Sequence, residues 1–258
     1  MNFEMDALLA TGGLFASMLV CTEIGRRIGI ARNLRDPEGE TKGAATAEAA
    51  MLALLGLLIA FTFSGAASRF EDRRHLIAEE ANAIGTAYLR IDLLPDDSQP
   101  AIRDLFRRYT DVRSITYSNV ADGDATRARL AEGVALQGEI WTKALTAAQR
   151  PEAPTQAAML LLPALNEMID ITETREAATR DHPPAIIFVL LSGLSLVSAL
   201  MVGYGTATSS RSWFHAAVFA AVLSVTIYVI VDLEFPRRGL IRVDAADESL
   251  VELRRSMQ

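Results

Sequence analysis

The sequence is organised around one segment that begins as an uncharged apolar run and continues as a charged helix. The run from Ala49 to Ser68 holds twenty residues without a formal charge, about the length that a helix needs to cross a bilayer. Apolar residues then recur at helical spacing, without a proline until Pro95. The segment therefore predicts one long helix that crosses a membrane and continues into water.

Three further apolar stretches predict three more spans. Ala7–Thr22 and Pro183–Ser210 carry no charge, and in Ser212–Val231 the only side chain that titrates near neutral pH is His215. The first stretch follows acidic residues, which is not typical of a signal peptide, so we expect it to be retained. The sequence thus predicts an all-α integral membrane protein. Its four spans lie at about residues 7–23, 47–68, 184–206 and 213–233.

The charged region between the second and third spans predicts a soluble helical domain. No alternating strand pattern occurs, and apolar residues follow a helical period in four segments joined by short loops, which favours antiparallel helices. The third of these segments places Leu130, Val134, Trp141 and Leu145 on its apolar face, and the second includes Ile115. Acidic pairs such as Glu79–Glu80 are expected on a solvated face.

The predicted organisation has four parts. Residues 1–68 form a transmembrane hairpin, 69–182 the helical domain, 183–235 a second hairpin and 236–258 a C-terminal tail. Within the first hairpin, the polar stretch Gly25–Gly43 is expected to be a loop or a short amphipathic turn.

Composition excludes several functions. The net charge is −7, and no basic tract or finger spacing occurs, so nucleic acid is not an expected partner. One cysteine, Cys21, excludes an internal disulfide, and three scattered histidines predict no metal site. No catalytic motif or cofactor-binding motif appears, so we expect neither an enzyme nor a bound cofactor.

The distribution of basic residues predicts the orientation. Four spans place both termini and the helical domain on one side, with eight arginines near the membrane on that side and six basic residues on the other. The positive-inside rule then predicts a multi-pass membrane protein with a cytoplasmic helical domain and cytoplasmic termini.

Two sets of residues are candidates for function. Along one face of the second span lie Leu57, Phe61, Ser64 or Gly65, and Ser68. A ring of such faces from several copies would form a narrow lumen, and apolar constrictions gate ions by dewetting. In the alternative interpretation, Phe61 and Phe63 face lipid and neighbouring helices.

The second set lies where spans leave the membrane. Charges at that depth are costly unless they are paired, so we predict at least one ion pair between the arginines that follow one span and the acids that end another. The arginines are Arg69, Arg73 and Arg74, and the acids are Asp232 and Glu234.

Two resemblances follow from these residues. The run IAFTFSGAASRFEDRR, residues 59–74, resembles the end of the second transmembrane helix of bacterial bestrophins. The whole layout resembles the bestrophin-like membrane proteins of bacteria and plastids, which share the EEANAIGTAYLR segment (here Glu79–Arg90) and the DLE-x-P-x-x-G ending (here Asp232–Gly239). The matching positions of the first run are Ala60, Phe61, Ser64, Arg69 and Arg74.

The resemblance implies a homo-oligomeric ion channel, with the second span lining the pore and the middle domain in the cytosol. Bestrophins are pentamers. The tryptophan pair of the bestrophin motif is replaced here by Phe70–Glu71, and the Tyr-Asp by Ala67–Ser68. No acidic calcium clasp is present, so calcium gating and anion selectivity are not carried over. The expected partners are the lipid bilayer, further copies of the chain and small inorganic ions. A membrane-anchored sensor or scaffold without conductance is the alternative.

Overall fold

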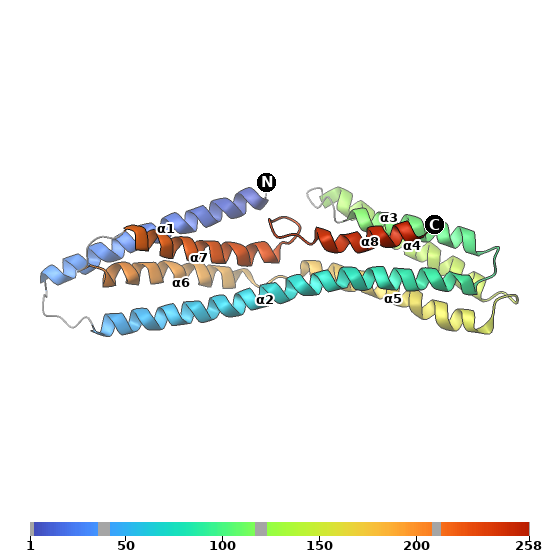
Figure 1. Ribbon diagram of the computed structural model, residues 1–258, viewed down its shortest axis with the longest axis horizontal. Coiled ribbons are helices and arrows are strands. Elements are labelled where there is room, and N and C mark those ends of the chain that lie inside the picture. Colours follow the sequence, from blue (N-terminus) through green and yellow to red (C-terminus); the bar gives the residue numbers. More distant parts are fainter. Residues whose placement is uncertain (1–2, 36–41, 117–122, 208–212, 258) are drawn as a thin grey trace. The chain divides into compact units, whose positions relative to one another are not determined.

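The structure is a computed structural model that describes residues 3–35, 42–116, 123–207 and 213–257 (Figure 1). It is 88% helical and has no strand among these residues, so the predicted all-α class is confirmed. The elements are α1 (Phe3–Arg35), α2 (Lys42–Leu89), a 3-10 turn η1 (Arg90–Leu93), α3 (Gln99–Thr116), α4 (Gly123–Ala148), α5 (Thr155–Arg180), α6 (Ala185–Gly205), α7 (Trp213–Glu234) and α8 (Asp244–Ser256).

The chain forms two compact units. Residues 1–68 and 182–240 form the first, which we call the membrane unit, and residues 69–181 and 241–258 form the second, which we call the helical unit. Among the described residues, four segments are long and apolar enough to cross a membrane, as judged by length and composition; they are Met5–Arg35, Ala45–Leu93, Thr155–Gly205 (which includes both α5 and α6) and Trp213–Glu234.

Two predicted boundaries are wrong. The helix of the first span does not end near Glu23 but continues to Arg35, because Gly25 and Gly29 face α6 and allow close packing where a turn was expected. The C-terminal segment is not a separate tail, because α8 packs within the helical unit. Residues 36–41 of the predicted first loop, residues 121–122 of a predicted polar break at 121–124, and residues 208–212 of the loop between the third and fourth spans lie outside the described residues.

The helix α2 is continuous through the predicted junction between its apolar and charged parts. It runs without a break from Lys42 to Leu89, which confirms the single long helix, and η1 completes the segment up to Leu93 (Figure 1). No proline lies within α2, so every residue of this stretch keeps the backbone N–H that a helical hydrogen bond needs.

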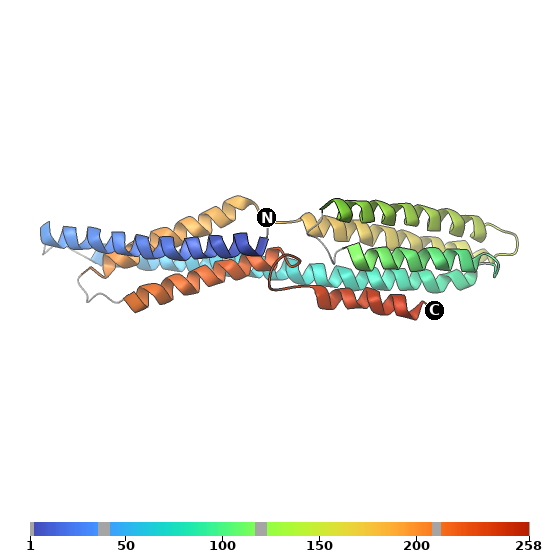
Figure 2. The same cartoon turned by 90° about the horizontal axis from the view of Figure 1, so that it is seen from above.

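In the membrane unit, α1 and α6 lie in close contact along a seam of glycines. A Cβ atom on Gly25 would lie 1.9 Å from the carbonyl oxygen of Leu200, and one on Gly203 would lie 2.0 Å from that of Thr22. Small residues at these positions let the two backbones approach as membrane helices often do. Both views show α1, α6 and α7 running alongside the first part of α2 (Figures 1 and 2).

Within the membrane unit, α2 packs through a small apolar cluster. Leu55 is buried against Leu191 of α6 and Ile227 of α7, and Leu58 and Ile59 pack beside them. This small cluster buries one face of α2, and the opposite face is exposed in the protomer.

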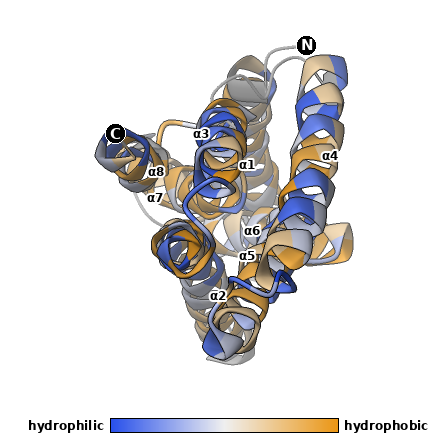
Figure 3. Cartoon of the chain, turned by 90° about the vertical axis from the view of Figure 1, so that its right-hand side faces the viewer, coloured by the Kyte–Doolittle hydropathy of each residue, from blue (hydrophilic) through white to orange (hydrophobic). Residues whose placement is uncertain are grey.

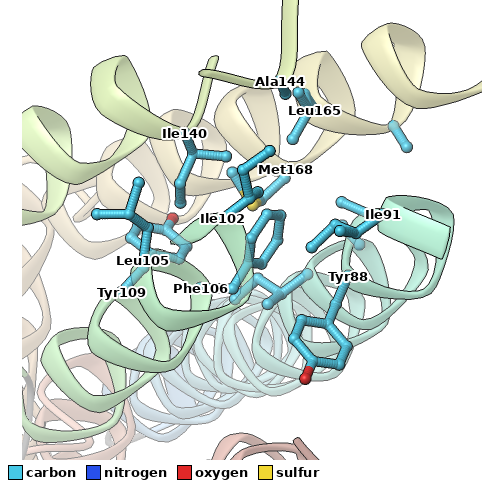
Figure 4. Packing of buried hydrophobic residues seen from close by; sticks show 14 of the residues in the cluster. Tyr88, Ile91, Ile102, Leu105, Phe106, Tyr109, Ile140, Ala144, Leu165 and Met168 are labelled. Carbon is cyan, nitrogen blue, oxygen red and sulfur yellow. The ribbon is translucent and has the colours of Figure 1, made fainter. Parts of the chain in front are cut away.

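The helical unit has a larger core to which every helix contributes. Residues such as Ile84, Phe106, Ile140 and Met168 are fully buried in it, and Tyr88 meets Phe106 edge to face (Figure 4). From the end of α2 through α5, successive helices run in opposite directions, as the short loops predict (Figure 1).

The predicted apolar face of α4 is partly wrong. Val134 is 65% exposed, whereas Leu136 and Ile140 are buried, so the true buried face is rotated from the predicted one. Ile115 of α3 is also 48% exposed. Figure 3 shows α4 with hydrophilic and hydrophobic residues in alternation, as expected for a helix with one buried side.

Candidate functional site

The predicted pore-lining residues lie along the exposed side of α2. Leu57 is 52% exposed and Phe61 is 69% exposed in the protomer. Ser64 and Ser68 are also exposed, whereas Gly65 is half-buried at the edge of the same face. We call Leu57, Phe61, Ser64 and Ser68 the α2 stripe.

The opposite side of α2 is buried. Leu55 is 2% exposed and Ala66 is fully buried. At 3.6 residues per turn, these two positions lie roughly 160–180° from Leu57 around the helix. One side of α2 thus packs within the membrane unit, and the α2 stripe stays exposed in the protomer.

The predicted boundary arginines have partners within the helical unit. Arg73 is 7% exposed and donates from Nε to the carbonyl oxygen of Ala178 (3.1 Å) and from Nη2 to that of Asp181 (2.7 Å). It therefore caps the C-terminal end of α5, where carbonyl groups lack helical partners. Arg74 makes an exposed pair with Glu71 at 3.0 Å, and Arg69 is half-buried.

The predicted boundary acids are buried within the membrane unit. Asp232 accepts a hydrogen bond from the backbone N–H of Leu240 (3.0 Å), so the chain folds back over the end of α7. A Cβ atom on Gly239 would lie 1.9 Å from the Asp232 carboxylate, so a larger residue in this hook would displace that carboxylate. Glu234, fully buried, lies 3.6 Å from Nδ1 of His182. The proposed pairing of these acids with the arginines stays a prediction.

The helical unit contains a buried ionic group that was not predicted from the sequence. Glu80 of α2 is fully buried and binds two guanidinium groups, those of Arg113 of α3 (2.5 Å) and Arg175 of α5. Arg175 also lies 3.2 Å from the carboxylate of Asp247 of α8. We call these four residues the Glu80 cluster, and their formal charges sum to zero (two positive, two negative). The expectation that Glu80 lies on a solvated face is wrong.

A neutral hydrogen-bonded group completes the polar centre of the same unit. The hydroxyl of Tyr109 lies 2.9 Å from that of Thr172, and Gln137 of α4 donates to Tyr109 at 2.9 Å. All three side chains are buried. With the Glu80 cluster, each of the helices α2, α3, α4, α5 and α8 contributes at least one polar side chain to this centre.

Electrostatics keeps the Glu80 carboxylate ionised in its buried position. Burial alone would raise the pKa of Glu80, but the guanidinium groups of Arg175 and Arg113 hold it below its ordinary value of 4.5. Burial raises the pKa of the Tyr109 hydroxyl, which therefore stays neutral. Among the residues that the structure describes, no group of three histidine, cysteine or acidic side chains could hold a metal ion.

The sequence did carry a signal for this cluster. Glu80 lies in the apolar stripe that includes Ile77 and Ile84, and Arg113 follows Phe106 and Tyr109 at the same spacing. A charged residue at a core position of an amphipathic helix indicates burial with a partner of opposite charge.

Comparison with known proteins decides the family. The family description "Bestrophin-like domain" matches residues 28–247, which is most of the chain. The protein belongs to the bestrophin-like family. The match includes the α2 stripe and all four members of the Glu80 cluster.

The fold of this bestrophin-like protein also has a counterpart among solved structures. It is similar to the crystal structure of a bacterial bestrophin homolog from Klebsiella pneumoniae, determined for a single-residue variant. The TM-score is 0.68 and the sequence identity 13%, over 93% of this chain and 97% of that chain. A search of functionally curated proteins finds no match.

Proposed function

We propose that this bestrophin-like protein is a homo-oligomeric ion channel, not an enzyme, in which α2 of each copy lines the pore. Membership of the bestrophin-like family supports a channel. The α2 stripe is the observation that supports α2 as the pore-lining helix. Leu57 and Phe61 are large and apolar, yet the membrane unit leaves them exposed. In a ring of copies they would face a shared axis.

The composition of the α2 stripe supports a gated pathway. It changes along the helix from large apolar side chains at Leu57 and Phe61 to hydroxyl groups at Ser64 and Ser68. A ring of phenylalanines leaves an opening too narrow and apolar for a hydrated ion at rest, so Phe61 acts as a gate by dewetting. The serine hydroxyls beside it offer hydrogen bonds to water and to ions, and Gly65 leaves room at the edge of this wider section.

The helical unit would form the vestibule on the cytoplasmic side of the bacterial inner membrane. The excess of arginines on that side supports this orientation. The copy number expected from bestrophins is five, and the transported species are small inorganic ions. A C-terminal fluorescent-protein fusion tests the orientation, because such a fusion fluoresces in the cytoplasm only.

The competing function is a membrane-anchored sensor or scaffold that conducts no ions. In that case the α2 stripe faces lipid, as apolar side chains of single spans commonly do. The buried polar centre of the helical unit would then only stabilise a domain that binds a partner.

The two functions are separated by flux through purified protein in liposomes. Replacing Phe61 with Ala should widen the constriction and raise the flux of Cl⁻, Na⁺ or K⁺ several-fold or more, while the oligomer keeps its mass. Phe63→Ala is the matched control, because Phe63 is the same residue type on another side of α2 and is 43% exposed. It should leave flux unchanged.

Equal impermeability of wild type, Phe61→Ala and Phe63→Ala to all three ions would favour the scaffold. A monomeric mass for the purified wild-type protein would exclude the proposed pore, because one α2 cannot enclose a lumen.

A further inference from the structure

The helix α8 is the last element of the helical unit and packs on it through an apolar side. Leu250 is fully buried, and Val243 and Met257, which flank the helix, are 2% and 1% exposed. Leu253 lies close to Gly85 of α2, where an added Cβ atom would be 3.2 Å from its Cδ1. With thirteen residues, α8 is too short to be stable as an isolated helix, so its structure depends on docking.

Polar contacts also hold α8, and two of them lie at the rim. Arg254 pairs with Asp111 of α3 at 2.8 Å, and Arg107 donates from Nε to the carbonyl oxygen of Met257 at 2.9 Å. The side chains of Arg254 and Asp111 are 34% and 49% exposed. Ion pairs that are this accessible to solvent contribute little to stability.

The third polar contact differs from the rim contacts in its surroundings. Asp247 binds Arg175, whose side chain is 3% exposed and which also holds the fully buried Glu80. Within the Glu80 cluster, α8 supplies one of the two negative charges. Removing Asp247 leaves Glu80 with Arg113 and Arg175, a buried set with one net positive charge (two positive, one negative). An uncompensated charge is costly in such an environment.

We propose that α8 is an ionic clasp of the helical unit, whose docking depends on Asp247 completing the charge balance of the buried Glu80 cluster. The apolar side of α8 supplies attraction that is not directional, whereas the buried guanidinium group requires an acidic side chain beside it. A shift of four residues would replace Asp247 by Val243 or Val251, neither of which can neutralise Arg175. Docking of the C-terminal helix and the ionic state of the domain centre are therefore coupled.

Hydrogen exchange of α8 amides in the purified full-length protein tests the clasp. Asp247→Asn keeps the size of the side chain and removes its charge, and it should raise exchange across α8 about tenfold or more, as expected for strongly coupled neighbours. Glu248→Gln is the matched control, because Glu248 is the next residue of the same helix and is exposed. It should change exchange less than about twofold.

A charge-balance variant distinguishes the clasp from a simple contact. Arg175→Met together with Asp247→Asn leaves Glu80 and Arg113 as a neutral pair, so α8 should be better protected in the double variant than in Asp247→Asn alone. If the two changes act independently, the double variant will be the least protected, which would overturn the proposal. Equal exchange in Asp247→Asn and Glu248→Gln would also overturn it, and this comparison decides the matter if the Arg175 variant does not fold.

Discussion

The two parts of α2 differ in which side chains they bury. In the membrane unit, α2 leaves large apolar side chains such as Phe61 exposed and buries only a narrow face around Leu55. In the helical unit, the same helix buries Ile77, Ile84 and even the carboxylate of Glu80. Exposed apolar surface is tolerated where lipid or another subunit covers it, whereas a buried charge is tolerated only where the fold supplies its partners.

Among the substitutions that test this difference, the largest loss of stability is expected at Glu80. Replacing Glu80 with Gln leaves the guanidinium groups of Arg113 and Arg175 buried without their shared carboxylate, which should destabilise the helical unit by about 3–5 kcal/mol. Denaturant unfolding followed by hydrogen exchange in α3 and α5 measures the loss. Glu79→Gln, at the exposed neighbouring position, is the control and should be within about 0.5 kcal/mol of wild type.

Acid should remove part of the same stabilisation without a mutation. Because the pKa of Glu80 in the folded protein lies below its ordinary value of 4.5, the unfolded chain binds a proton more readily than the folded chain. The contribution of Glu80 is therefore complete above about pH 4.5 and is lost as the pH falls through the lower folded pKa.

Stability of the helical unit should thus fall more steeply on acidification in wild type than in the Glu80→Gln variant. Thermal unfolding between about pH 6 and pH 3 would measure this difference. Parallel curves for the two proteins would mean that Glu80 is not the titrating group.

A smaller effect is expected from the glycine seam of the membrane unit. A methyl group at Gly203 would meet the backbone of Thr22, so Gly203→Ala should separate α1 from α6 and cost about 1–3 kcal/mol. Thermal stability in detergent gives the measurement. Gly12→Ala in α1 has nothing within 4 Å of the added atom and should be neutral or slightly stabilising.

The smallest of these effects is expected at Tyr109. Tyr109→Phe removes the hydroxyl that joins Gln137 and Thr172, and it should cost about 1–2 kcal/mol because buried partners lose a hydrogen bond. Chemical denaturation would detect this loss. A cost as large as that of Glu80→Gln would mean that the neutral group and the Glu80 cluster act as one network.

The spacing of apolar residues predicted the helices well, but it predicted less well which face of each helix is buried. The long helix α2 follows directly from the sequence. The predicted face of α4 was wrong at Val134, because alanines and glycines leave several rotations of this helix nearly equal in apolar content. Gly25 was interpreted as a loop signal, yet it serves a close helix contact that a single chain segment cannot reveal.

The sequence by itself determined the all-α class and the positions of the four apolar helices, because the length of an apolar run and its lack of charge are local properties. It also identified the family through short motifs such as residues 79–90 and 232–239. Only the tertiary structure decided which side of α2 is covered and where the charges lie. Glu80, Arg113, Arg175 and Asp247 come from four helices, and their neutrality exists only once those helices are packed together.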